Sequence, residues 1–350
     1  MKICAINTDN KACGNYRIKI PFEALKKDGL DITVFSFDKV TNIKLLLQYD
    51  VIILQRIIDP KVLNIVKILL NNKKIVIHEI DDNLFEVNKN NPAYKTFNRK
   101  SEATKIFTEA SKICSYIFTT TETLAKELNK YLKLDIAKYK WFNNALDISN
   151  PVYQNSLRNK IEPNKIIIGF QGGSGHQDDI NYIIEPVKHI VNKYDNVMFA
   201  FIGQPDYFDR FNLKRDKAIH IPFTNDFRTF MNFPSHFDIG LAPLCHKDNF
   251  NISKSYLKIL EFGAFKIPTI CSNVGDFKNF DKDSVILTDN SFLSWVTNIE
   301  KLINDVVLRK EIGLNVYKNI SEGVYSLKHI NNARKQFFKE VENENFITGR

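Results

Sequence analysis

The sequence predicts an α/β protein built from two Rossmann-like, doubly wound domains. Short runs rich in β-branched residues alternate with amphipathic stretches along all 350 residues, a pattern typical of parallel sheets covered on both faces. The chain is also longer than one typical core supports. A turn-rich segment, 143–151, interrupts the alternation. We therefore expect a first domain over 1–147 and a second over 148–327, with ligands bound in a cleft at the carboxyl ends of the strands.

The first domain is expected to alternate six strands with five helices. Its strands are predicted at 2–6, 31–37, 50–55, 73–79, 115–119 and 136–141, and its helices at 16–28, 41–48, 59–72, 101–112 and 121–133. The second domain repeats the pattern. Its strands are predicted at 166–170, 196–203, 218–222, 237–243, 267–272 and 284–288, and the helices at 177–193, 225–232, 253–266, 290–305, 306–318 and 328–345.

The bulk composition is that of an ordinary globular protein, with 44% hydrophobic and 25% charged residues. No run approaches the roughly 18 apolar residues of a membrane span, and the first residues do not form a signal peptide. Five scattered cysteines fit reduced thiols, so we expect a cytoplasmic protein. The net charge of +9 attracts nucleotides, anionic lipid headgroups or nucleic acid, and it does not choose among them.

Segment 251–268 is the most informative stretch of the chain. Read as one helix, it places Lys254, Lys258 and Glu261 on a single stripe within about 40°, with apolar residues around most of the remaining surface. A helix of this kind is usually buried, and buried charge is tolerated only when it is paired or meets a ligand. Two cations and one carboxylate would suit phosphates and vicinal hydroxyls. The alternative is an exposed Lys258–Glu261 pair at helical spacing.

A loop of small residues follows the first strand of the second domain. Gly172, Gly173 and Ser174 would expose backbone N–H groups that can hold phosphate oxygens, and His176 could donate to the same anion. The alternative is that Ser174 and Asp178 only cap the next helix. The loop matches neither the phosphate-binding loop of ATPases nor the glycine pattern of dinucleotide-binding enzymes, so both classes are disfavoured.

Two loops of the first domain also carry polar side chains. Asp81 and Asp82 follow a predicted strand and could orient or deprotonate an acceptor hydroxyl, bind a divalent cation, or cap a helix. Gly14, Tyr16 and Arg17 lie where the first strand leads into a helix. A cation in a first helical turn is unfavourable, so an anionic ligand would explain Arg17, and a solvated arginine is the alternative.

Together these segments resemble the GT-B fold glycosyltransferases, most closely glycosyltransferase family 4 and related bacterial and phage enzymes. The similarity is strongest over 237–244 and 250–262, which resemble the donor-nucleotide segment of the family. The glycine-serine loop, the Asp81–Asp82 strand end and the Gly14–Arg17 loop fall where the family places its cleft loops. The resemblance implies that the last helix, within 328–350, packs back on the first domain.

The resemblance further implies a nucleoside-diphosphate sugar donor and hexosyl or pentosyl transfer with retention, without a metal or other cofactor. Glu261 would hold the ribose hydroxyls, and Lys254, with Lys258 as a second candidate, would neutralise the diphosphate together with backbone from 172–174. The family often shows two glutamates eight positions apart, and Ser253 stands at the first of these positions. Asp248 or Asn251 would be its substitutes.

The resemblance leaves the acceptor open. A glycan or lipid-linked intermediate at the inner membrane face is the first expectation, which would make the protein peripheral to that membrane. A phage-type enzyme that glycosylates a hydroxylated DNA base is the alternative. A non-catalytic sugar-nucleotide-binding protein and a sugar-nucleotide epimerase are rivals from other classes, because a fold does not fix a function. The donor sugar, its base, the linkage and the oligomeric state are not determined by the sequence.

Overall fold

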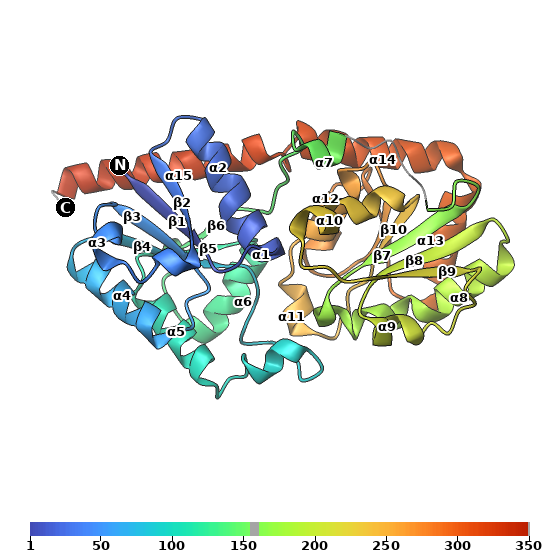
Figure 1. Cartoon of the computed structure of the whole chain (residues 1–350), viewed down its shortest axis with the longest axis horizontal. Helices are drawn as coiled ribbons and strands as arrows, with labels where there is room; N and C mark the ends of the chain where they lie inside the picture. The colour runs from blue at the N-terminus through green and yellow to red at the C-terminus, as the bar shows by residue number, and fades with distance from the viewer. Residues whose placement is uncertain (155–160, 349–350) are drawn as a thin grey trace. The chain divides into compact units, whose positions relative to one another are not determined.

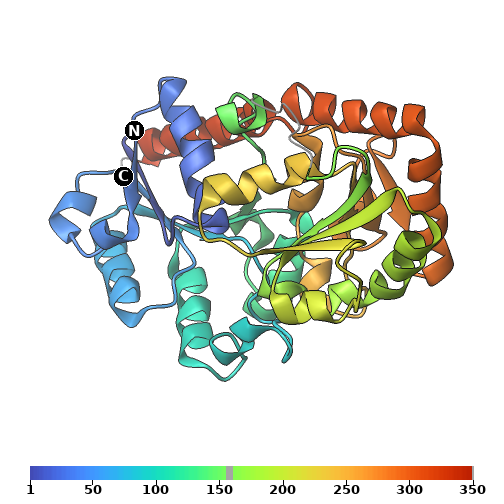
Figure 2. The same cartoon turned by 45° about the vertical axis from the view of Figure 1, so that its right-hand side comes forward.

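The computed structural model describes residues 1–154 and 161–348, which form two compact units. The first unit contains 1–87, 94–145 and the C-terminal segment from 324, and the second contains 88–93 and 146–323. Each unit is a six-stranded parallel sheet with helices on both faces, as Figure 1 and Figure 2 show. The two doubly wound sheets confirm the predicted fold class. The assignment of the short segment 88–93 to the second unit was not expected from the sequence.

The first sheet has the strand order β2-β1-β3-β4-β5-β6. Its strands are β1 (Ile3–Asn7), β2 (Ile32–Ser36), β3 (Val51–Gln55), β4 (Ile75–Ile80), β5 (Tyr116–Thr119) and β6 (Tyr139–Trp141). Its helices are α1 (Ala12–Gly14), a π-helical turn (Asn15–Lys19), α2 (Ile20–Lys27), α3 (Ile43–Leu46), α4 (Pro60–Asn71), α5 (Glu102–Ile113) and α6 (Glu122–Leu132). Because β2 and β3 flank β1, the topological switch point lies between β1 and β3.

The C-terminal helix α15 (Leu327–Thr348) packs on the first unit, as the resemblance implies. Phe337 and Phe338 of this helix lie in one core cluster with Phe22 of α2 and Phe118 of β5. The Phe118 and Phe337 rings meet edge to face, with their centroids 5.2 Å apart. Burial of these aromatic side chains fixes the helix to the sheet.

The second sheet has the strand order β12-β11-β10-β7-β8-β9. Its strands are β7 (Ile166–Gln171), β8 (Val197–Gly203), β9 (Ala218–Pro222), β10 (Ile239–Ala242), β11 (Thr269–Ser272) and β12 (Val285–Thr288). Its helices are α7 (Pro151–Gln154), α8 (Ile184–Lys193), α9 (Pro205–Asp209), α10 (Phe227–Asn232), α11 (Asn249–Ile252), α12 (Leu257–Gly263), α13 (Phe292–Asn304) and α14 (Val306–Ser321). Here the switch point lies between β7 and β10.

All twelve predicted strands are present, but the continuous helix predicted over 253–266 is wrong. Only α12 lies within these bounds; α11 ends before them, and residues 253–256 separate the two short helices. Asp248 caps α11 by accepting the Phe250 N–H at 2.9 Å, and α11 is only four residues long. Serine and asparagine, which are frequent here, are weaker helix formers than leucine and glutamate. Within 1–154 and 161–348, none of the helices has the length and apolar character needed to cross a bilayer.

Candidate functional site

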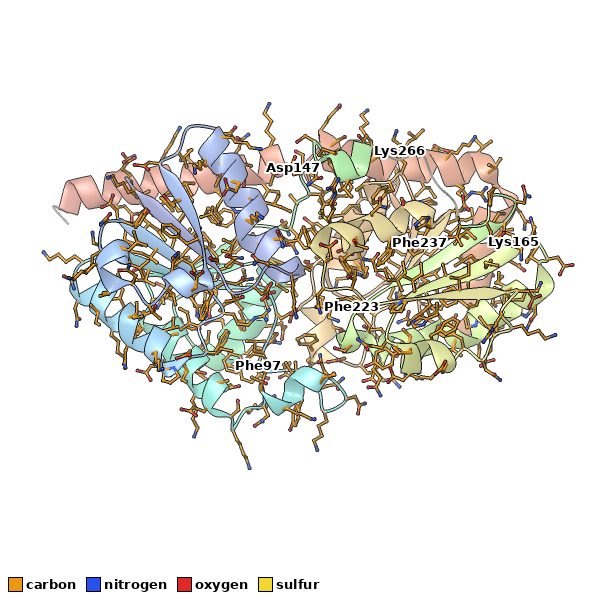
Figure 3. All side chains as sticks on the ribbon, in the orientation of Figure 1. Phe97, Asp147, Lys165, Phe223, Phe237 and Lys266 are labelled. Carbon is orange, nitrogen blue, oxygen red and sulfur yellow. The ribbon has the colours of Figure 1, made fainter. Side chains whose placement is uncertain are left out.

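Close packing against the second sheet fixes the position of α12. Gly240 of β10 leaves room for the Phe262 ring, because a Cβ at this glycine would lie 2.4 Å from that ring. Phe262 in turn meets Phe237 edge to face, with ring centroids 5.8 Å apart, and Figure 3 marks Phe237 within the second unit. The neighbouring Glu261 is therefore held on a helix that has little room to move.

Glu261 and Lys258 form a partly buried ion pair on α12. Lys258 Nζ lies 3.0 Å from Glu261 Oε2, and the exposed fractions of the two side chains are 15% and 5%. The alternative interpretation of this pair as a surface feature therefore fails. The single stripe is also incorrect, because Lys254 lies before α12 and contacts a different carboxylate.

Asp179 joins the two segments that leave the switch point of the second sheet. Its Oδ1 accepts the Cys245 N–H at 2.7 Å and the Asn251 side-chain amide at 2.6 Å. Its Oδ2 lies 2.8 Å from His176 Nδ1 and 3.7 Å from Lys254 Nζ. Burial alone would raise the pKa of Asp179, but Lys254, His176 and the Cys245 N–H outweigh it and lower that pKa. The sequence analysis gave Asp179 no role beyond its place in the helix predicted over 177–193.

His176 is neutral at physiological pH. Burial, and then the positive charge of Lys254, lower its pKa to about 4. The Asp179 carboxylate must therefore receive the Nδ1–H, which leaves Nε2 as an acceptor. The expectation that His176 donates to an anion is thus corrected, because the remaining ring nitrogen carries no proton. His176 can instead accept a hydrogen bond from a hydroxyl group.

The glycine-serine loop lies beside these side chains, but not all of its N–H groups are free. The Gly172 N–H donates to the Ile202 carbonyl at 2.9 Å, so it continues the sheet and cannot hold a phosphate. A Cβ on Gly172 would lie 2.8 Å from the His176 ring, which explains the glycine. Ser174 begins a short 3-10 turn, and its carbonyl accepts the Tyr207 hydroxyl at 2.8 Å. Gly173 precedes this turn as its N-cap residue.

Lys254 is the cation of this cluster that is least tightly bound to its carboxylate partner. Its 3.7 Å distance to Asp179 Oδ2 is longer than a hydrogen bond, and the exposed fraction of its side chain is 16%. An incoming anion could therefore approach Lys254 without breaking a strong bond. Among the described residues, no group of three His, Cys, Asp or Glu side chains is placed to hold a metal ion. That the reaction needs no metal stays a prediction.

In the first unit, Asp81 pairs with Arg56, a residue that sequence reasoning missed. The Arg56 Nη2 atom lies 2.6 and 2.7 Å from the two Asp81 oxygens. Burial would raise the pKa of Asp81, but Arg56 and a hydrogen bond from Cys13 lower it. An ionised carboxylate held in this way is a poor base, so the structure favours orientation over deprotonation as its role. Asp82 is half-buried next to it.

The Arg17 guanidinium is buried and bound to groups of the protein, so an anionic ligand is not needed to explain it. Its guanidinium is 1% exposed and donates to Glu79 at 2.8 Å, to the Phe142 carbonyl at 2.8 Å and to the Asn144 side chain at 3.0 Å. It lies in the π-helical turn rather than in a first helical turn, which removes the dipole argument. Arg17 therefore stabilises the core of the first unit.

The other two residues of the Gly14–Arg17 loop are also part of the folded loop and core. The Gly14 N–H donates to Asp9 Oδ1 at 3.3 Å, which closes the loop after β1. The Tyr16 side chain is buried, with 2% exposure. Both residues are therefore placed to shape the loop rather than to face solvent.

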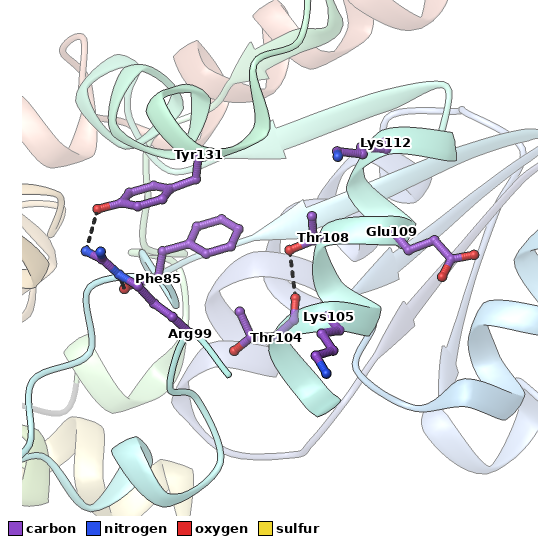
Figure 4. A pocket seen from close by; sticks show the side chains of 8 residues that line it. All are labelled: Phe85, Arg99, Thr104, Lys105, Thr108, Glu109, Lys112 and Tyr131. Carbon is purple, nitrogen blue, oxygen red and sulfur yellow. Dashed lines mark hydrogen bonds between the residues drawn. The ribbon is translucent and has the colours of Figure 1, made fainter. Parts of the chain in front are cut away.

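A hollow of about 470 Å³ between α5 and α6 contains none of the predicted site residues (Figure 4). Phe85 and Tyr131 stack there, with ring centroids 4.8 Å apart, and Arg99 lies 5.0 Å from the centre of the Tyr131 ring. The polar groups already have partners: Arg99 contacts Glu86, and Glu109 contacts Lys67. We assign no ligand to this hollow.

The fold of the whole chain is that of the GT-B glycosyltransferases. HepE from Anabaena, solved with UDP and glucose, is 13% identical to this chain, with a TM-score of 0.68 and coverage of 97% of this chain and 99% of that one. The catalytic domain of starch synthase IV from Arabidopsis thaliana, solved with ADP and acarbose, is 10% identical, with the same TM-score and the same coverage. These similarities establish the fold alone.

The same fold is shared by a protein of another class. A putative UDP-N-acetylglucosamine 2-epimerase from Listeria monocytogenes is 11% identical, with a TM-score of 0.58 and coverage of 97% of both chains. No protein-family model matches the sequence, and no curated protein matches it either. The site residues must therefore carry the functional argument.

Proposed function

We propose that the protein is a glycosyltransferase that moves a sugar from a nucleoside-diphosphate sugar to an acceptor hydroxyl. The observation that carries the proposal is the cluster at the β7–β10 switch point, where Asp179 holds Lys254 and His176 together. Ligands of doubly wound sheets bind at such points. A cation, a neutral histidine acceptor and a buried glutamate suit a molecule that carries both phosphates and hydroxyls.

In the proposed reaction, the bond between the anomeric carbon and the phosphate oxygen breaks, and its electron pair leaves with the diphosphate. Lys254 stabilises this developing charge, which is the largest expected contribution to catalysis. The acceptor oxygen forms the new bond to the anomeric carbon, and its proton passes to an oxygen of the leaving diphosphate. Glu261 binds the ribose hydroxyls, and His176 Nε2 accepts from a hydroxyl of the transferred sugar.

Retention at the anomeric carbon is part of this proposal through the family resemblance. Ser253, where the family often has an acid, is buried, and its hydroxyl lies 3.5 Å from the Asn249 carbonyl. Asn251 has its amide on Asp179, whereas its Oδ1 is buried and has no partner among the described residues. Asn251 is therefore a better substitute for the missing acid than Asp248, whose Oδ1 caps α11.

Thermal unfolding with UDP, GDP, ADP and TDP sugars tests the donor. A ligand at 100 times its dissociation constant should add about 2.7 kcal/mol of stability. Release of nucleoside diphosphate should accompany transfer, and binding without release would favour a non-catalytic binding protein. Stabilisation by none of these nucleotides would overturn the proposal.

A further inference from the structure

Helix α14, at the edge of the second unit, carries apolar side chains on two opposite faces (Figure 1). Its inner face is packed closely, with Ile312, Val316 and Ile320 buried. A Cβ on Gly313 would lie only 2.1 Å from the Lys266 carbonyl oxygen. Because a helix packed in this way cannot turn about its axis, the opposite face is fixed as an outer surface.

The outer face of α14 carries a line of exposed apolar side chains. The exposed fractions of Val307 and Leu314 are 71% and 53%. These residues are seven positions apart, so at about 100° per residue their directions differ by only about 20°. A helix on the surface of a soluble domain normally carries polar side chains on this side. An apolar line that is held outward on a fixed helix is typical of a surface that another protein covers.

Two opposite charges lie on one side of this apolar line. Glu311 and Lys318 are both exposed, and neither forms an ion pair within 1–154 and 161–348. Seven positions separate them, which is about 10 Å along the helix axis. Side chains of one helix form ion pairs at a spacing of three or four positions, so these two charges cannot neutralise each other within one copy of α14.

The order of these side chains along α14 is complementary to a second copy of the same helix. A two-fold axis that crosses α14 between Leu314 and Asn315 makes the two helices antiparallel, and it lies midway between Glu311 and Lys318. It places Glu311 of each copy beside Lys318 of the other copy, and it packs the two Leu314 side chains together. A symmetric interface requires such self-complementarity. An anionic membrane or a nucleic acid is a poorer fit, because the second unit has 21 Lys and Arg against 21 Asp and Glu.

We propose that the protein forms a symmetric dimer through antiparallel pairing of α14. The apolar line of each copy covers that of the other, and two Glu311–Lys318 ion pairs fix the register. One pair of helices buries less than the roughly 1,200–2,000 Å² of a standard interface, so we expect a reversible dimer with a dissociation constant in the micromolar range. The dimer does not rest on the proposed transferase function.

Analytical ultracentrifugation of the full chain, from about 1 to about 200 µM, tests this proposal. The variants are Glu311→Lys, Lys318→Glu, the double variant that carries both changes, and Leu314→Ala. The matched controls lie on α13: Leu293→Ala removes a leucine that is 71% exposed, and Lys301→Glu reverses an exposed lysine. All of these side chains are exposed, so the variants should keep the unfolding temperature of the wild type, which thermal unfolding verifies.

We expect each single charge reversal to weaken dimerisation about tenfold, because it turns two ion pairs into two contacts between like charges. The double variant exchanges the charges and should return to within about threefold of the wild type. Leu314→Ala should also weaken the dimer about tenfold, and both controls should dimerise like the wild type. A wild-type protein that stays monomeric at every concentration would overturn the proposal. So would a dimer that the single reversals leave unchanged, or a double variant as weak as the single ones.

Discussion

The carboxyl edges of the two sheets share a topology and differ in their chemistry. At the β7–β10 switch point, Lys254 and His176 contact Asp179, and Lys258 contacts Glu261. The distance from Lys254 Nζ to Asp179 is long, at 3.7 Å. At the β1–β3 switch point, Arg56 is tightly paired with Asp81, and the side-chain N–H group of Gln55 has no partner among the described residues. The edge of the second sheet can therefore release a cation to a phosphate, whereas the edge of the first sheet offers neutral donors and carboxylates.

The comparison shows that topology selects the place of a site and side chains select its ligand. Both edges lie where parallel strands diverge, so the fold alone would predict two similar pockets. The difference arises from a few residues that the register brings together. Four predictions separate the two edges, beginning with the largest expected effect.

Replacing Arg17 by methionine should cost about 3–5 kcal/mol of unfolding free energy, because it leaves Glu79 buried without its partner. Nucleotide affinity should be unchanged, since the pair lies in the first unit. Urea denaturation measures the first effect and calorimetry the second. The control Lys67→Met, which breaks an exposed pair with Glu109, should cost less than about 1 kcal/mol. A lost nucleotide affinity in Arg17→Met, with stability retained, would restore the anion-binding interpretation.

Replacing Lys254 by alanine should lower turnover about a hundredfold, because the leaving diphosphate loses its cation. The control is Lys217→Ala, which removes a lysine of similar exposure, 15%, that is paired with Asp195 elsewhere in the second unit. Steady-state release of nucleoside diphosphate measures both variants. Equal turnover in the two variants would remove Lys254 from the reaction.

Stability should fall as the pH drops from 6.5 to about 5, because His78 in the first unit is neutral when folded. Burial lowers the pKa of His78 to about 3. Its Nε2 accepts the Ile57 N–H at 2.9 Å, and its Nδ1 is hydrogen-bonded to the Ser111 hydroxyl. The unfolded state therefore binds more protons in this range, and the loss should reach about 2 kcal/mol. Denaturation of His78→Gln at both pH values should show a smaller loss than in wild type or in the exposed control His189→Gln. An equal loss in all three proteins would refute this assignment.

Replacing Asp179 by asparagine should lower turnover about tenfold, since the carboxylate positions Lys254 and fixes the tautomer of His176. Nitrogen NMR of the histidine ring should show Nδ1–H in wild type and a mixture of tautomers in the variant. Asp179→Glu should restore part of the activity. A single tautomer in Asp179→Asn, with full activity, would contradict the positioning role.

Local patterns in the sequence predicted the strands well, because short buried runs of apolar residues, such as those of β3 and β8, are visible in the sequence itself. The two edges were harder to predict. Arg56 meets Asp81 only because Gln55 pairs with Glu79 across parallel strands, and Asp179 meets Lys254 although the two residues are 75 positions apart. No local pattern reports such contacts. The prediction of one helix over 253–266 failed because the side chain of Asn251 is bound to Asp179 and the helix is interrupted after α11.

Hydrogen–deuterium exchange with UDP, GDP, ADP and TDP tests the central claim most directly, because it shows where a nucleotide binds. We expect protection by the nucleotide that binds over 173–179 and 245–261 in the second unit, and none over 8–14 or 55–62 in the first. Lys254→Ala should weaken that protection, whereas Lys217→Ala should not. Protection confined to the first unit, or a bound nucleotide that leaves 245–261 unprotected, would contradict the account.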